Sequence, residues 1–196
     1  MKTFNVNTLH PVACFAIELI IGKEGGYSDD KTDQGGKTNF GISDARDGQC
    51  DGLIDINNDG QGDIVVKNLT YAQAAQIYYN DYWLKNCCEQ LHPALALTVF
   101  DCAVNQGGSF ARKALQRLAK TTIDGIIGPK TIATVNAIAV LTLLEKFNEA
   151  RLKRYRRIVK RNKSQQKYIK GWLNRLRDID ERCVAIATFG FTDEQP

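Results

Sequence analysis

The sequence lacks several patterns that would place it in common classes of protein. It contains no G-x-G-x-x-G motif and no P-loop, so nothing indicates a nucleotide or flavin site. Its most apolar segment, residues 12–21, is interrupted by Glu18 and is too short to span a bilayer. Neither a basic region nor an A-x-A site flanks that segment, so we expect no cleavable signal peptide.

The six cysteines show neither a C-x-x-C pair nor the spacing of a zinc site. Cys14 and Cys102 lie in apolar patterns with helical spacing, which is typical of small core residues. The sequence does not choose among the possible disulfide pairings. We therefore expect burial to explain most of the cysteines.

Acidic residues are absent from residues 151–177, which hold 12 Lys and Arg. The rest of the chain holds 14 basic and 22 acidic residues, although the whole chain has a net charge of +4. Such a segment is either a solvated helical face or a surface for a polyanion. No known nucleic-acid-reading motif accompanies it, so we do not expect a nucleic-acid partner.

The remaining patterns predict a mainly α-helical protein of 196 residues, 43% of them hydrophobic. Pro11 suits the first turn of a helix, and Gly25 ends that helix so that Glu24 is its last residue. The following residues, 27–42, are rich in Gly, Asp, Thr and Asn and indicate a loop or a short β-ribbon. Thr70 is a suitable N-cap for a later helix.

Three residues around the first predicted helix end suit glycoside hydrolysis. This reaction needs one carboxylic acid as proton donor and usually a second carboxylate. Glu24 lies at a helix C-terminus, whose partial negative charge favours the protonated acid. Asp33 is then either the base that activates water or a residue that only holds the ribbon, with Asp29 and Asp30 as rival carboxylates. Thr38 is a candidate for positioning a water molecule.

Five motifs in order resemble glycoside hydrolase family 108, a family of N-acetylmuramidases. They are E-G-G-Y at 24–27, D-Q-G-G-K-T-N-F-G-I at 33–42, F-D-C-A-V-N-Q-G at 100–107, D-G-I-I-G-P-K-T at 124–131 and G-W-L-N-R at 171–175. The last two resemble the peptidoglycan-binding segment usually joined to that family. The order Glu24, Asp33, Thr38 is also similar to the triad of phage lysozymes, with one residue fewer between Asp and Thr.

This resemblance implies a lysozyme-like fold with a short β-ribbon after the first helix and a helical C-terminal lobe. It implies hydrolysis of the β-1,4 bond after N-acetylmuramic acid, with Glu24 as the catalytic residue. We expect a catalytic lobe at 1–95, with an inserted loop at 44–69, and a peptidoglycan-binding lobe at 96–190. Tyr27, Trp83 and Asn105 are candidate sugar contacts, although Trp83 is equally well explained as a core residue.

An Asp-rich insertion at residues 47–63 departs from the family pattern. Its D-x-N-x-D-G-x-x-D sequence is similar to the first nine positions of an EF-hand calcium loop. The expected calcium ligands are Asp55, Asn57, Asp59, Gln61 through its carbonyl, and Asp63. Val66 replaces the usual twelfth-position Glu, so Asp51 is a candidate to complete the site. The alternative is a surface loop without metal.

Two other functions remain possible for the same chain. A lytic transglycosylase would use the same Glu but no partner that activates water, and a peptidoglycan-binding or export module would not need Glu24. For the enzyme, we expect a monomeric endolysin made in the cytoplasm of a bacterial host. It would act on peptidoglycan in the periplasm or cell wall after release, and residues 151–177 would bind the anionic cell envelope.

Overall fold

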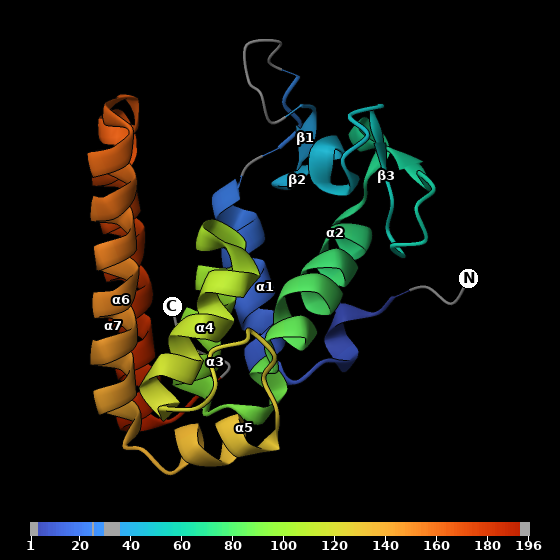
Figure 1. Cartoon of the computed structure of the whole chain (residues 1–196). Coiled ribbons are helices and arrows are strands. Elements are labelled where there is room, and N and C mark those ends of the chain that lie inside the picture. The colour runs from blue at the N-terminus through green and yellow to red at the C-terminus, as the bar shows by residue number, and fades with distance from the viewer. Residues whose placement is uncertain (1–3, 25, 30–35, 193–196) are drawn as a thin grey trace. The chain divides into compact units, whose positions relative to one another are not determined.

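The protein is described here from a computed structural model that covers residues 4–24, 26–29 and 36–192. The side chains of residues 7, 23, 24 and 47 also lie outside the description. The chain forms two compact units, Met1–Asp81 and Tyr82–Pro196, which are described separately below. Figure 1 shows the ribbon with its elements labelled.

The first unit combines two helices with two small β-hairpins. Its elements are the 3-10 helix η1 (Val6–Thr8), α1 (Pro11–Glu24), β1 (Thr38–Asn39), β2 (Ile42–Ser43), η2 (Asp44–Asp47), β3 (Leu53–Ile54), β4 (Ile64–Val65), η3 (Val66–Asn68) and α2 (Tyr71–Ile77). A π-helix, η4 (Tyr78–Trp83), follows α2 and spans the boundary between the units.

Local signals explain where the helices of this unit begin. Pro11 opens α1, where its missing N–H costs nothing because the first turn of a helix has no partner for it. Thr70 caps α2 through a capping box. Its hydroxyl accepts from the Gln73 backbone N–H, and the Gln73 side chain accepts from the Thr70 N–H. Both predicted helix starts are therefore confirmed.

The predicted ribbon is the β1–β2 hairpin, in which Asn39 pairs with Ile42. Its two-residue turn places Phe40 and Gly41 at φ 51° and 72°, the left-handed conformation that type I′ turns require. A second hairpin, β3–β4, pairs Ile54 with Ile64 and flanks the Asp-rich loop. The sequence predicts only an inserted loop at 44–69 here, because strands of two residues are too short to leave a periodic pattern.

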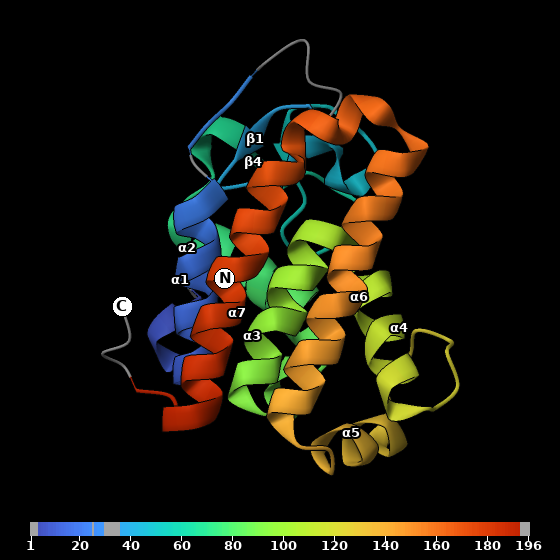
Figure 2. The ribbon, with the colours of Figure 1, turned by 90° about the vertical axis from the view of Figure 1, so that its left-hand side faces the viewer.

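In the second unit, every regular element among the described residues is a helix. Its elements are η5 (Leu84–Asn86), η6 (Cys88–Gln90), α3 (Pro93–Cys102), the π-helix η7 (Ala103–Gly107), α4 (Gly108–Ala119), α5 (Pro129–Asn136), α6 (Val140–Arg161), η8 (Lys163–Tyr168) and α7 (Ile169–Phe189). The long helices α6 and α7 run side by side, and α3 packs against both (Figure 2). The predicted mainly α architecture, with its ribbon and helical C-terminal lobe, is confirmed.

A buried ion pair joins α3 to α6 within this unit. The side chains of Asp101 and Arg151 are both 0% exposed, and the Arg151 guanidinium donates to the Asp101 carboxylate. Asp101 also accepts from Arg175 Nε on α7 at 2.8 Å, and Arg151 Nη1 donates to Thr98 at 2.9 Å. A buried charge requires such partners, because removing it from water costs several kcal/mol. One arginine of the basic segment is therefore a core residue.

All six cysteines are free thiols. Cys88, Cys102 and Cys183 are buried, Cys14 and Cys87 are half-buried, and Cys50 is exposed. Burial raises the pKa of the Cys102 thiol to about 12, so it stays protonated at neutral pH. In the described part of the chain, no helix combines the length and the apolar character needed to cross a membrane.

Candidate active site

The end of α1 carries the residue that the sequence assigns to catalysis. Glu24 is the last residue of this helix, as predicted, and Ile17, Ile20 and Ile21 bury the preceding turns in the core. The carboxyl group of Glu24 lies outside the described side chains, and Asp33 lies outside the described residues. The backbone therefore gives the position of Glu24 at the helix end, while the sequence gives its chemistry.

The described residues between the end of α1 and the first hairpin are 26–29 and 36–37. Ser28 and Thr38 form an isolated antiparallel bridge, with N–H to O distances of 2.8 and 2.9 Å. Thr38 is half-buried and also pairs with Ser43, so it is bonded on both sides. The bridge holds together the two ends of the segment that contains Asp33. Tyr27 is 42% exposed, and its hydroxyl donates to Asp29 at 3.4 Å.

The other two predicted sugar contacts lie in the second unit. Trp83 is 1% exposed, its Nε1 donates to Glu89 at 2.7 Å, and its ring meets Phe100 edge-on at 5.6 Å. This environment favours the alternative interpretation of Trp83 as a core residue. Asn105 lies half-buried in η7, and its side-chain oxygen accepts from the hydroxyl of Tyr155.

The Asp-rich loop is organised by hydrogen bonds from its own backbone. Both carboxylate oxygens of Asp55 accept from backbone N–H groups, those of Asn58, Asp59 and Gly60. Three further side-chain oxygens accept in the same way. The Asn57 side chain accepts from the Asp59 N–H, the Asp59 carboxylate from the Gln61 N–H, and the Asp63 carboxylate from the Ile56 N–H. Asp51 accepts from Leu53 N, and Val66 is fully buried. Among the described residues, no three His, Cys, Asp or Glu side chains are grouped to hold a metal ion.

A positive charge lies beside this loop. The Arg46 guanidinium donates to the Asp55 carbonyl and to Asn58 Oδ1, and it pairs with Asp81. Burial alone would raise the pKa of Asp55, but the backbone N–H bonds from Gly60, Asn58 and Asp59, together with Arg46, lower it below its ordinary value. Asp55 is therefore ionised at neutral pH.

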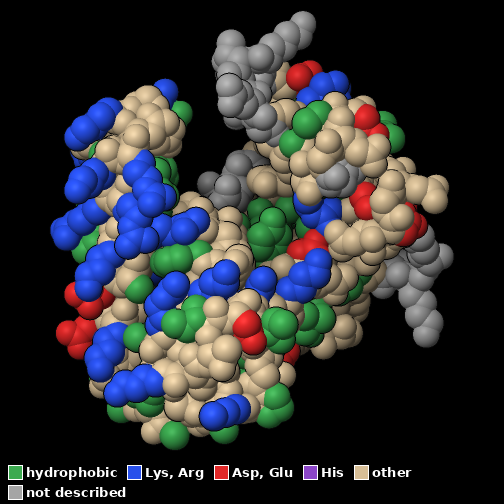
Figure 3. Space-filling model, in the orientation of Figure 1, with side chains coloured by type: hydrophobic (Ala, Val, Ile, Leu, Met, Phe, Trp, Pro, Cys, Tyr) green, Lys and Arg blue, Asp and Glu red, His purple; other side chains and the backbone are tan. Residues whose placement is uncertain are grey.

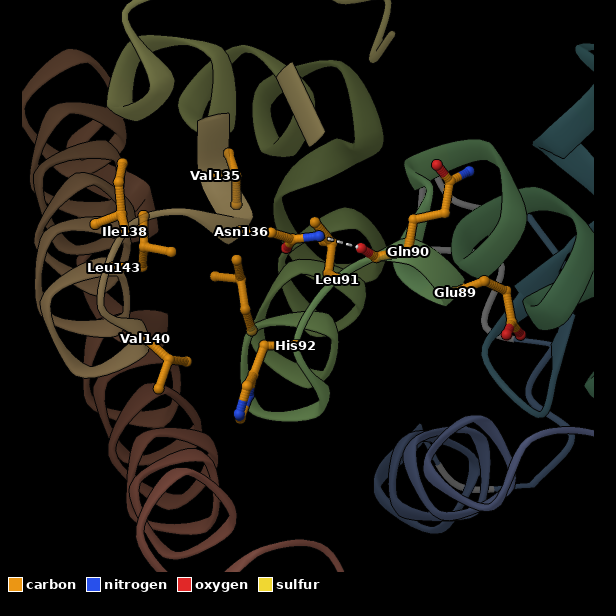
Figure 4. A pocket seen from close by; sticks show the side chains of 10 residues that line it. Glu89, Gln90, Leu91, His92, Val135, Asn136, Ile138, Val140 and Leu143 are labelled. Carbon is orange, nitrogen blue, oxygen red and sulfur yellow. Dashed lines mark hydrogen bonds between the residues drawn. The ribbon is translucent and has the colours of Figure 1, made fainter. Parts of the chain in front are cut away.

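Two hollows with volumes of about 470 and 510 Å³ lie in the second unit. The first lies between η6, the start of α3, α5 and the start of α6 (Figure 4). Its wall is mostly aliphatic, and the Asn136 side chain donates across it to the Gln90 carbonyl at 2.8 Å. The second is a groove between α4 and α6, lined by Gln106, Gly107, Ser109, Phe110, Lys113, Arg117, Ala150, Lys153, Arg154 and Arg157.

Comparison with known proteins identifies both parts of the chain. Residues 17–107 match the sequence model of the family described as glycosyl hydrolase 108. Residues 110–177 match the family described as predicted peptidoglycan domain. The matched region, residues 17–107, is a glycosyl hydrolase 108 region. This glycosyl hydrolase is thus a glycosidase that acts on peptidoglycan, and peptidoglycan is its partner.

A solved structure supports the fold. The glycosyl hydrolase is similar to the structure of Brucella abortus SagA, with a TM-score of 0.74 and 29% identical residues. The similarity covers 90% of this chain and 95% of SagA, and it confirms the lysozyme-like, mainly α fold. No curated protein sequence matches the chain.

The groove between α4 and α6 is a feature that the sequence alone does not predict. Its residues recur along α4 as Phe110, Lys113 and Arg117 and along α6 as Ala150, Arg154 and Arg157, so each helix contributes one face. This spacing was visible in the sequence. The pairing of the two helices was not, because it depends on contacts between segments about 40 residues apart.

Proposed function

We propose that the protein hydrolyses the β-1,4 bond between N-acetylmuramic acid and N-acetylglucosamine in bacterial peptidoglycan, which leads to cell lysis. The observation that carries the proposal is the placement of Glu24. It ends α1 inside the region that matches the glycosyl hydrolase family, and the Ser28–Thr38 bridge anchors the hairpin that follows later in the chain.

Glu24 is the proposed general acid that protonates the leaving oxygen of the glycosidic bond. A carboxylic acid at a helix C-terminus stays protonated more readily, because the carbonyl ends of the helix disfavour a negative charge there. Asp33 is the proposed group that activates water or stabilises the positively charged sugar. Thr38 would orient the attacking water, and Tyr27 would contact the sugar with its exposed ring.

The test compares Glu24→Gln with Glu18→Gln, a change at an exposed position of the same helix. Glu24→Gln removes the proton donor and should lower lysis of permeabilised cells about 10²–10⁴-fold or more. Glu18→Gln should lyse at nearly the wild-type rate. Lysis by Glu24→Gln that equals the control would disprove the role of Glu24.

Analysis of the cleaved products tests the reaction itself. Hydrolysis should leave a reducing N-acetylmuramic acid end on each fragment. An anhydro sugar would instead identify a lytic transglycosylase. If purified protein binds peptidoglycan without releasing either product, the chain is a binding module and the proposal fails.

We also propose that the loop containing Asp55, Asn57, Asp59 and Asp63 binds Ca²⁺ as a structural ion, with the carbonyl of Gln61 as a further ligand. Mixed carboxylate, amide and carbonyl oxygens are typical calcium ligands. A carboxylate oxygen can accept more than one bond, so the backbone bonds of this loop still leave capacity for a cation.

The exposed cations of α6 would attach the protein to the anionic cell envelope. Figure 3 shows Lys and Arg side chains gathered over α6 and α4. Arg156 and Lys160 are exposed and do not line the groove. We propose a monomer that is made in the host cytoplasm and reaches the periplasm or cell wall after release.

A further inference from the structure

We infer that the groove between α4 and α6 binds the acidic stem peptide of peptidoglycan through the peptide's carboxylates. The inference rests on peptidoglycan being the polymer on which the chain acts. It adds a peptide-recognition site in the second unit to the glycan chemistry proposed for Glu24.

The charge of the groove is the first observation. Its wall carries five cations and no carboxylate: Lys113, Arg117, Lys153, Arg154 and Arg157, called the groove cations below. Only Lys153 forms a salt bridge in the described part of the chain, with Glu149, which does not line the groove. Like charges this close repel one another, and an anionic ligand would relieve that repulsion.

The environment of Arg154 is the second observation. Its guanidinium lies over the Phe110 ring, 4.4 Å from the centroid, which fixes its orientation. Its Nε is shielded from solvent and has no hydrogen-bond partner in the structure. A buried donor without a partner is costly, and a planar guanidinium suits a carboxylate that accepts two parallel bonds. A guanidinium fixed in this way, with one donor atom lacking a partner, points to a carboxylate ligand.

The backbone at the groove edge is the third observation. Gln106 and Gly107 lie at the end of the π-helix η7, and such π-helical turns are frequent at functional sites. Gly107 has φ 92° and ψ 135°, a conformation that glycine alone adopts readily. The chain keeps this backbone conformation directly beside the groove cations.

The size of the groove selects a compact ligand. About 510 Å³ is within the range of roughly 300–1,000 Å³ typical of sites for small molecules. In peptidoglycan the lactyl group of muramic acid is bonded to the peptide as an amide, so the glycan strand is neutral and the stem peptide carries the carboxylates. A short acidic peptide therefore fits both the volume and the charge better than the glycan does.

The experiment measures binding of N-acetylmuramoyl tripeptide by isothermal titration calorimetry. This probe has no glycosidic bond, so the result does not depend on whether the proposed hydrolysis occurs. The groove variant is Arg117→Gln/Arg157→Gln, in which both side chains are exposed and folding should survive. The control variant is Lys120→Gln/Lys130→Gln, which removes the same charge from exposed positions outside the groove.

We expect the groove variant to weaken binding at least about tenfold, because charged hydrogen bonds are lost, and the control to change it little. Arg154→Lys keeps the charge but not the planar guanidinium and should also weaken binding. The same probe with amidated carboxylates should bind poorly to the wild type. Equal losses in the two double variants, or unchanged binding of the amidated probe, would overturn the inference.

Discussion

The buried pair of Asp101 and Arg151 gives the sharpest prediction for stability. Asp101→Asn keeps the shape of the side chain but leaves the Arg151 guanidinium in the core without its counter-charge. In the wild type, burial lowers the pKa of Arg151 and the Asp101 carboxylate raises it, and the net shift of this pKa is upward. Even without Asp101, Arg151 remains charged in the variant, because a guanidinium is not deprotonated in proteins.

The magnitude follows from the burial of both partners. Breaking a buried ion pair by removing one partner costs about 3–5 kcal/mol. Arg151 keeps its bonds to Thr98 and to Gln106 Oε1, so we expect about 3 kcal/mol, at the lower end. With a urea m-value of about 1–3 kcal/mol per molar, the unfolding midpoint should fall by about 1–3 M.

Tryptophan fluorescence is the suitable assay. The two tryptophans of the chain, Trp83 and Trp172, both lie in the second unit, so their signal follows the unfolding of that unit. Glu149→Gln is the matched control, because it breaks the exposed pair with Lys153, which solvent screens, and should cost little stability.

A second variant makes the reasoning refutable. Adding Arg151→Met to Asp101→Asn removes the unpaired buried charge, so the double variant should be more stable than Asp101→Asn alone. If Asp101→Asn loses no more stability than Glu149→Gln, or if the double variant is the least stable of all, the account of this ion pair is wrong.

Three further predictions concern the loop and the envelope. Calcium at 100 times its dissociation constant should stabilise the fold by about 2.7 kcal/mol. Chelation should therefore lower the melting temperature and Asp59→Ala should abolish the response, whereas identical curves would exclude the site. Because the folded pKa of Asp55 is lowered, its contribution to stability is present above its unfolded pKa of about 3.9 and is lost as the pH falls through the folded value. Hydrogen exchange of the Asn58 and Gly60 amides should thus lose protection below about pH 4, and less steeply in Asp55→Asn. Arg156→Glu/Lys160→Glu should weaken binding to anionic vesicles in a salt-dependent way, and unchanged binding would exclude α6 as the envelope contact.

Local signals made much of the fold predictable from the sequence. Pro11, Gly25 and Thr70 act within one or two turns of their own positions, so the bounds of α1 and the start of α2 could be predicted. Glu24 could be placed at a helix end for the same reason. The motif spacing then supplied the family and the proposed chemistry.

Features that depend on distant contacts could not be predicted. Arg151 resembles its neighbours in a basic segment, and only its pairing with Asp101, 50 residues earlier, makes it a core residue. Trp83 could have been a sugar contact or a core residue, and its hydrogen bond to Glu89 and packing on Phe100 favour the core. The π-helices η4 and η7 could not be predicted either, because no residue type marks the extra residue in a turn.

The distribution of the thiols also makes opening of the second unit observable by chemistry. A thiol-specific reagent should modify Cys50 in the native protein, because Cys50 is the exposed cysteine. Modification of Cys102 and Cys183 requires the second unit to open, since both side chains are buried and burial raises the pKa of both. Mass spectrometry of timed labelling would therefore give the opening rate of the helical unit in the wild-type sequence, because the natural cysteines are the labelling sites.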